Sequence, residues 1–132
     1  GSTVFLQSVG LAVWGRPVYD HHPGFRPLEG LPSRPWDAWY VVVAHGLFMG
    51  PDAEPYRSSP ITPEELAKAN CDYIALGHVH AFRNETRGSA PAFYCGAPSG
   101  TDSPTAALVD MDPANGITVR PIRIPLGGDG ES

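Results

Sequence analysis

The stretch CDYIALGHVH, residues 71–80, decides the fold of this chain. Its central run Tyr73–Leu76 is continuously apolar, which is typical of a strand buried on both faces. A glycine and two histidines follow at once, so the strand is expected to open into a loop that carries both histidines. Upstream, the run Tyr40–Ala44 has the same character and ends in His45-Gly46. We therefore expect two buried strands of an α/β sheet with histidines at their carboxyl ends.

Histidine and glycine stand side by side at both strand ends, as His45-Gly46 and as Gly77-His78, and His80 follows two residues later. Ligands of open α/β sheets gather at the carboxyl ends of the strands. Neutral imidazole is a common ligand of divalent transition metals, and an adjacent glycine lets backbone and ligand approach without a Cβ clash. Each histidine alone is better explained as a hydrogen-bonded loop residue. Together, His45, His78 and His80 favour a metal site.

The rest of the sequence predicts short elements. Fifteen glycines and 15 prolines among 132 residues are about twice the usual share and exclude long helices. Thr62-Pro63-Glu64-Glu65 predicts a capping box and a first-turn proline for a short helix that ends near Asn70. The segment from Val18 to Pro35 is predicted to be a long loop. The further predicted strands are Thr3–Gln7, Val9–Trp14, Ala81–Glu85, Ala92–Cys95, Ala106–Asp112 and Ile117–Ile124.

Composition excludes several classes of protein. The chain has 9 Lys and Arg against 14 Asp and Glu, a net charge of −5 without a basic tract, so an electrostatic footprint for nucleic acid is not expected. The longest apolar run, residues 39–44, is far shorter than the roughly 20 residues of a bilayer span. Hydrophobic residues make up 42% of the chain, enough for the core of one small domain. Cys71 and Cys95 are expected to be buried thiols of a cytoplasmic protein, with residues 127–132 as a frayed tail.

Three segments in this order resemble the C-terminal half of the calcineurin-like metallophosphoesterases. They are VVVAHG at 41–46, CDYIALGHVH at 71–80 and FYCGAP at 93–98. Within that superfamily the chain is most similar to the SbcD-type repair exonucleases. The resemblance covers residues 40–124 well and 9–18 more loosely, and its middle segment is the specific part. It implies an α/β, β-rich fold in which residues 1–132 form a single partial domain, the C-terminal half of a β-sandwich flanked by helices.

The resemblance also implies a chemistry. Members of the family are hydrolases in which two divalent metal ions, here manganese first and iron or zinc as alternatives, clamp a phosphate and activate water for in-line attack. By analogy, His45 and His78 ligate one metal ion and His80 the other. The substrate is a phosphomonoester or phosphodiester, which leaves nucleotides and nucleic acid open. The resemblance assigns the loop on the substrate side to Gly46, Gly77, Tyr94, Gly96 and Pro98.

The chain also departs from the family pattern. The Asn-His-Asp motif, which supplies a ligand and the histidine near the leaving group, is absent from the sequence, so no catalytic acid is assigned. Asp20-His21-His22 matches the family's Asp-x-His spacing, but it lies in a proline-rich loop, which favours a solvated segment over a ligand. Asp72 is expected to be a surface residue at the start of a strand, and Asp102 a turn residue. The remaining histidines are too few to hold a hydrolytic metal tightly. We therefore expect half of a phosphoesterase, inactive alone.

Such a half would expose apolar sheet surface, so we expect it to self-associate or to bind the missing N-terminal half of the domain, but no membrane. Two other interpretations stay open. One is a non-catalytic binding or scaffold domain that keeps the fold. The other is a small mononuclear metal protein in which His45, His78 and His80 bind one ion, which requires all three rings to converge.

Overall fold

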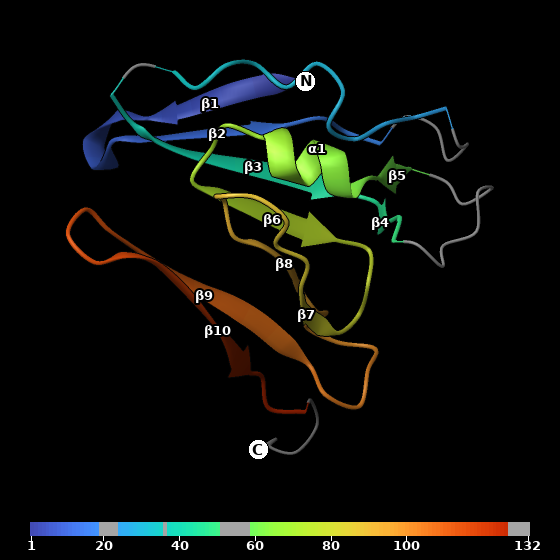
Figure 1. Cartoon of the computed structure of the whole chain (residues 1–132). Helices are drawn as coiled ribbons and strands as arrows, with labels where there is room; N and C mark the ends of the chain where they lie inside the picture. The colour runs from blue at the N-terminus through green and yellow to red at the C-terminus, as the bar shows by residue number, and fades with distance from the viewer. Residues whose placement is uncertain (19–23, 36, 51–58, 127–132) are drawn as a thin grey trace.

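The computed structural model describes residues 1–18, 24–35, 37–50 and 59–126. At its centre lies a six-stranded sheet, which Figure 1 shows face-on. Its strands are Ser2–Leu6 (β1), Leu11–Gly15 (β2), Trp39–His45 (β3), Tyr73–Gly77 (β6), Phe82–Asn84 (β7) and Ala92–Cys95 (β8). They are arranged in the order β1-β2-β3-β6-β8-β7. The four inner strands are parallel to one another, and the two edge strands run antiparallel to their neighbours. All four inner strands therefore end at the same edge of the sheet.

The remaining elements are short. They are a 3-10 helix Gln7–Val9 (η1), the parallel pair Leu47–Phe48 (β4) and Pro60–Ile61 (β5), the helix Pro63–Lys68 (α1), and a hairpin of Thr105–Asp112 (β9) and Gly116–Arg123 (β10). The predicted strands and the predicted helix are confirmed, with boundaries that shift by at most two residues. The two-residue strands β4 and β5 were not predicted, since runs of two residues carry no periodicity.

One face of the sheet, called here the closed face, carries the core. Tyr40, Val42 and Ala44 of β3 point to this side, and all are buried. Ile74 and Leu76 of β6 lie on the same side and belong to the same cluster. Figure 1 shows α1 lying across this face. The inner strands of the sheet therefore bury this side with residues of the chain itself. The covering residues in that cluster are Leu28, Ile61, Leu66 and Ala69.

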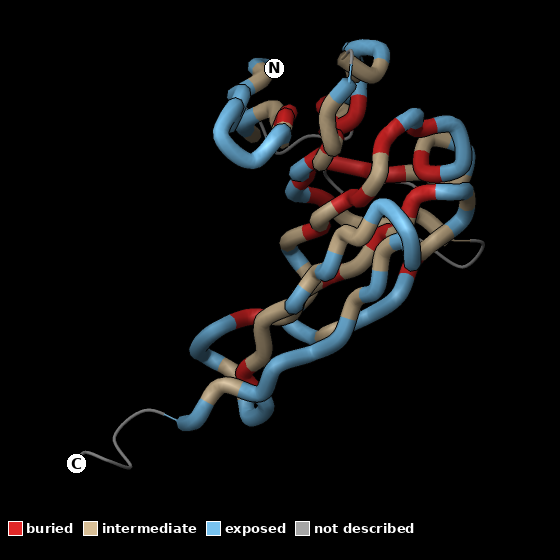
Figure 2. The backbone as a smooth tube through the Cα atoms, turned by 90° about the vertical axis from the view of Figure 1, so that its left-hand side faces the viewer, coloured by how far each residue is buried: buried red, intermediate tan, exposed pale blue. Residues whose placement is uncertain are grey.

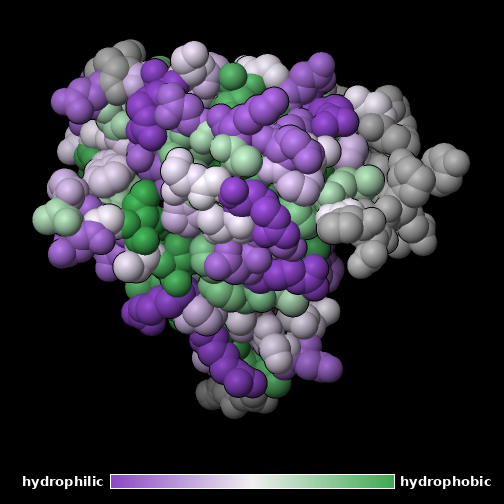
Figure 3. Space-filling model, viewed as in Figure 1, coloured by the Kyte–Doolittle hydropathy of each residue, from purple (hydrophilic) through white to green (hydrophobic). Residues whose placement is uncertain are grey.

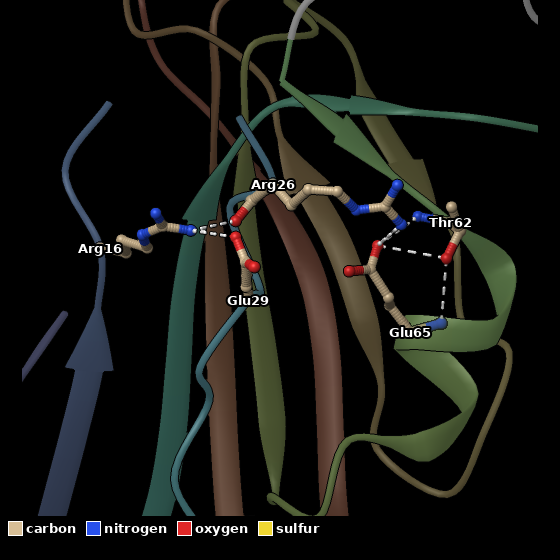
Figure 4. Close-up of polar contacts among 5 residues, drawn as sticks. All are labelled: Arg16, Arg26, Glu29, Thr62 and Glu65. Carbon is tan, nitrogen blue, oxygen red and sulfur yellow. Dashed lines mark hydrogen bonds and ion pairs between the residues drawn. The ribbon is translucent and has the colours of Figure 1, made fainter. Parts of the chain in front are cut away.

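The start of α1 is fixed by the predicted capping box. Thr62 accepts a hydrogen bond from the Glu65 backbone N–H at 3.2 Å, and the Glu65 carboxylate accepts one from the Thr62 N–H at 3.0 Å. The same carboxylate pairs with Arg26 at 3.2 Å. The Arg26 carbonyl in turn accepts a hydrogen bond from Arg16, which also reaches Glu29 (Figure 4). This chain of contacts ties the segment around residue 26 to both the end of β2 and the helix, so the loop is held in place across the closed face.

The opposite face of the sheet is called here the open face. Its residues alternate along each strand with those of the closed face. Val41 and Val43 of β3 lie on this side, as do Val4 and Leu6 of β1 and Ala75 of β6, by the two-residue period of a strand and the register of the sheet. Val43 is 45% exposed and Val4 58%. In Figure 2 the buried residues concentrate in the middle of the molecule, while the β1 region and the β9–β10 hairpin are mostly half-buried or exposed. The open face is apolar and only partly covered.

The β9–β10 hairpin contacts the sheet mainly through β9, which lies against β7 and β8. In Figure 3, which shows the α1 side, hydrophobic surface gathers at the lower left, where the sheet adjoins the hairpin. The protein is thus a mixed α/β structure with mostly strands. The predicted α/β, β-rich class is confirmed. The finer prediction of a sandwich flanked by helices stays a prediction, because the described residues form one six-stranded sheet, two separate two-stranded sheets and the helix α1. No helix in the described segments is long and apolar enough to cross a membrane.

One expectation about a single residue is corrected. The sequence suggested that Asp72, before β6, is a surface residue. In the structure its carboxylate forms two hydrogen bonds with the Arg34 guanidinium, at 2.7 and 3.0 Å, and accepts a third from the Tyr40 N–H at 2.8 Å. These bonds hold the pKa of Arg34 above its ordinary value, and they join the loop before β3 to the start of β6.

Candidate functional site

The two sequence motifs meet at the carboxyl edge of the sheet. Because β3 and β6 are parallel neighbours, His45 stands directly beside Gly77, the residue before His78. The imidazole rings of His45 and His78 lie edge to face, with their centroids 5.4 Å apart and their planes at 87°. Both side chains are exposed. The structure therefore brings together two of the three predicted metal ligands, and it leaves them accessible.

Alternation along β3 also fixes the side of the sheet on which His45 lies. Ala44 points into the closed face, so His45 shares the open face with Val43 and Val41. The paired imidazoles thus occupy the corner where the carboxyl edge of the sheet meets the open face. Anything that covers the open face would approach this corner.

Glycine at position 77 allows the two rings to approach. A Cβ on Gly77 would lie 3.3 Å from Nδ1 of His45, so a side chain there would crowd the imidazole. The Gly77 carbonyl also accepts a hydrogen bond of 3.0 Å from the N–H of Gly46, just after His45. The predicted role of the glycine, close approach without a Cβ, is therefore visible in the geometry.

Backbone strain concentrates at the same point. Among the described residues, only His78, with φ of 125°, and Ser59, with φ of 53°, have positive φ without being glycine. His78 follows the strand that pairs with His45. Ser59 lies against the turn after His45, since its carbonyl accepts a hydrogen bond of 3.0 Å from the Leu47 N–H. Strained residues persist only where the surroundings hold them, and they cluster at functional sites.

The turn after His45 is enclosed on all sides. A Cβ on Gly46 would collide with the Ser59 carbonyl oxygen and would lie 2.9 Å from Cγ of Pro27. The Tyr94 hydroxyl donates a hydrogen bond of 2.7 Å to the Gly46 carbonyl. It accepts another, of 2.8 Å, from the Phe48 N–H. The backbone that carries His45 is therefore fixed by contacts from β5, β6 and β8.

The other predicted site residues lie elsewhere. His80 is exposed in the bend before β7. Within the described part of the chain, no three His, Cys, Asp or Glu side chains form a group that could hold a metal ion, so His80 does not complete a site with His45 and His78. The convergence required by the mononuclear interpretation is absent from this arrangement. Asp20-His21-His22 lies outside the described residues.

The predicted substrate-side loop is only partly a loop. Tyr94 belongs to β8 and its side chain is fully buried, so it lies in the core and not against a ligand. Gly96 begins the loop after β8 with φ of 85°, where a Cβ would collide with Oγ1 of Thr105. Pro98 is exposed in that loop. The loop prediction is therefore corrected for Tyr94.

Three features at this edge were not found from the sequence. One is the strain at Ser59, for which a Ser-Pro pair gives no signal. Another is the contact of the Tyr94 hydroxyl with residues 46 and 48, since no local pattern reports a partner so far away in the chain. The third is Arg16, which follows β2 at the same edge and stacks over the Phe25 ring at 4.6 Å. Its guanidinium is already engaged by the Arg26 carbonyl and Glu29.

The donor set at the corner fits part of a metal site. Two exposed imidazoles within contact of each other are the donors that manganese, iron or zinc accept in mixed nitrogen and oxygen sites. Two ligands are fewer than the three or four that such ions use in enzymes. The described residues therefore supply an incomplete set of ligands. No family model and no curated protein matches this chain in sequence comparisons.

Proposed function

We propose that this chain is the C-terminal part of a two-metal phosphoesterase, to which His45 and His78 supply imidazole ligands. The observation that carries the proposal is the exposed, edge-to-face pair of these two histidines at a strained strand end. Strain at His78 costs free energy, on the order of 1–3 kcal/mol for such a residue, and that cost is expected where a side chain must be presented in one direction.

Each residue at the corner has a distinct part in this function. His45 and His78 would hold a metal ion through their ring nitrogens, and Gly46 and Gly77 let the two strand ends approach. When bound, a pair of divalent ions, with manganese favoured over iron or zinc, would neutralise the phosphate oxygens and activate water for hydrolysis. The exposed His80 would serve the second ion. A phosphoester substrate, either a monoester or a diester, would enter from the open side of the corner.

The proposal also names what completes the site. The open face is apolar, and His45 lies on it beside Val43, which is 45% exposed. A segment that covered this face would bury Val43. It would also contact the corner that carries His45 and His78, called here the metal corner. We assign this segment to the N-terminal half of the same domain, with a second copy of the chain as the alternative. The chain alone is then inactive. Its free thiols fit the reducing cytoplasm, where we place the protein.

A test of the proposal uses the purified chain and Mn²⁺. Because Mn²⁺ is paramagnetic, even weak binding broadens the imidazole C–H resonances of its ligands in NMR spectra. We expect the signals of His45 and His78 to broaden together at low Mn²⁺, and His78→Ala to abolish the effect at His45. His80→Ala is the comparison variant. His80 lies outside the pair and is assigned to the second ion, whose other ligands the described residues do not supply, so this variant should leave the broadening at His45 unchanged.

Two other results of this experiment would each support one of the alternative functions. An absence of selective broadening at the pair would reject the metal site and favour the scaffold interpretation. Tight binding that is lost equally in His45→Ala, His78→Ala and His80→Ala would favour the mononuclear protein.

A further inference from the structure

The Tyr94 side chain reaches from β8 to the turn that carries His45. Its ring is fully buried in the closed face. Its hydroxyl contacts the backbone of Gly46 and Phe48, which are 48 and 46 positions away in the sequence. It donates to the Gly46 carbonyl at 2.7 Å and accepts from the Phe48 N–H at 2.8 Å. A single hydroxyl therefore satisfies one acceptor and one donor on the two sides of Leu47.

These two bonds belong to a longer path that ends at the histidines. Gly46 is bonded on one side by Tyr94 and on the other by the Gly77 carbonyl, at 3.0 Å. His45 precedes Gly46, and His78 follows Gly77. The position of each imidazole therefore depends on where the Gly46 peptide is held. A peptide group deprived of a buried partner costs about 1–3 kcal/mol, so the turn would move to find another one.

The hydroxyl keeps its proton under all ordinary conditions. Burial raises the pKa of Tyr94 to about 12, although the Phe48 N–H works in the other direction. The hydrogen bond to the Gly46 carbonyl, which requires that proton, is therefore present throughout the neutral range.

We propose that Tyr94 is a positioning residue for the metal corner, whose hydroxyl fixes the turn after His45 and thereby sets His45 against His78. The inference rests on the proposed function for its consequence in metal binding, but its geometric part is independent of any metal. Tyr94 touches neither the metal nor the substrate. It acts through the Gly46 peptide.

The test is Tyr94→Phe, which deletes the hydroxyl and keeps the ring in the core. Two readouts are taken on the purified chain: the nuclear Overhauser effect between the His45 and His78 imidazole protons without metal, and Mn²⁺-induced broadening of the same signals. We expect the metal-free contact to weaken. We also expect the Mn²⁺ affinity of the pair to fall about tenfold, the lower range for loss of a residue that orients a metal ligand.

Tyr40→Phe is the matched control. Tyr40 is equally buried on the closed face, and its hydroxyl donates to the Pro32 carbonyl at 3.2 Å, at the opposite end of the sheet. It should lower stability without changing either readout. If Tyr94→Phe folds and leaves both readouts as in the parent chain, Tyr94 has no positioning role.

The two proposals can fail separately. A parent chain that shows the contact between the rings but no response to Mn²⁺ rejects the metal function, while loss of the contact in Tyr94→Phe still supports positioning. If Tyr94→Phe does not fold in buffer, both readouts are repeated in sucrose, which favours the folded state without replacing the hydroxyl. A ring contact that is unchanged in the folded variant overturns the inference.

Discussion

The two faces of the central sheet differ although they are built from the same strands. On β3, Val42 is fully buried in the closed face, whereas its neighbour Val43 is 45% exposed on the open face. The closed face is covered by α1, by the loop around Leu28 and by Ile61. In the described part of the chain the open face is less covered, and strand β9 of the hairpin contacts β7 and β8 at one side of the sheet. The described residues thus complete the core on one face of the sheet and leave the other face partly exposed.

The two faces also carry residues with different roles. The closed face contains the residues that fold the chain, and the histidine pair lies at the rim of the open face. The residues of the closed face are committed to packing, whereas His45 and His78 are exposed at the rim of the open face. The following predictions test how far the two faces differ, beginning with the largest expected effect.

Val42→Ala and Val43→Ala form a matched pair. The first removes two methyl groups from a close-packed core and should lower the free energy of unfolding by about 2 kcal/mol, from roughly 0.8 kcal/mol per buried carbon plus a cavity cost. The second should change it by less than about 0.5 kcal/mol, as for an exposed site. Urea unfolding of both variants measures the contrast. Equal losses would show that the open face is covered in solution.

Association through the open face is the next test. We expect the purified chain to form dimers at high concentration in sedimentation experiments. Val43→Asp should weaken the dimer by roughly tenfold or more, because a charge would be buried in an apolar interface. Leu108→Asp is the control, since Leu108 is 39% exposed on the hairpin, and it should have little effect. A chain that stays monomeric at all concentrations would remove the second copy as a partner and leave the N-terminal half.

The closed face also depends on the capping box of α1. Thr62→Ala removes the side-chain oxygen that accepts from the Glu65 N–H, and it should lower the free energy of unfolding by about 1 kcal/mol. Thr118→Ala, at an exposed position of β10, is the control and should be close to neutral. Thermal unfolding compares the two. If both variants behave alike, the helix is held by the packing of Leu66 and not by its cap.

The sequence predicted the parts of the molecule that depend on local pattern. Apolar runs gave β3 and β6, and Thr62 with Glu65 gave the start of α1, because a strand period and a cap are local signals. His45 and His78 were found because each stands directly after such a run. The contact between their rings, however, requires β3 and β6 to be parallel neighbours, which no local pattern states.

Long-range contacts account for what the sequence missed. Asp72 was taken for a surface residue because its partner Arg34 is 38 positions away. The resemblance assigned Tyr94 to the substrate-side loop, whereas its hydroxyl is bonded across the sheet to the Gly46 carbonyl. The open face was expected from the resemblance, but the closed face on the other side, with α1 and the Leu28 loop packed on it, follows from the fold of the whole chain.

The smallest effect concerns the β9–β10 hairpin, whose strand β9 contacts β7 and β8. The Asp112 carboxylate accepts hydrogen bonds from the Ala114 N–H at 2.8 Å, and from the Asn115 side chain at 3.1 Å and its N–H at 3.3 Å. These bonds lower the pKa of Asp112 below its ordinary 3.8, the Ala114 N–H most. The folded state thus favours the charged form, so the stabilisation is complete above about pH 4 and is lost as the pH falls through the lowered pKa.

Asp112→Asn tests this local origin. It should speed amide hydrogen exchange of Ala114 at neutral pH by a few-fold, because the charge that strengthens the bonds is gone. The difference from the parent chain should shrink as the pH falls through the lowered pKa of Asp112 and vanish once the carboxyl is protonated. Asp102→Asn, in an exposed bend outside the hairpin, should leave this exchange unchanged. If Asp112→Asn does not change the exchange at neutral pH, the hairpin is held by its packing against β7 and β8 and not by its own turn, which would bring it closer in character to the closed face.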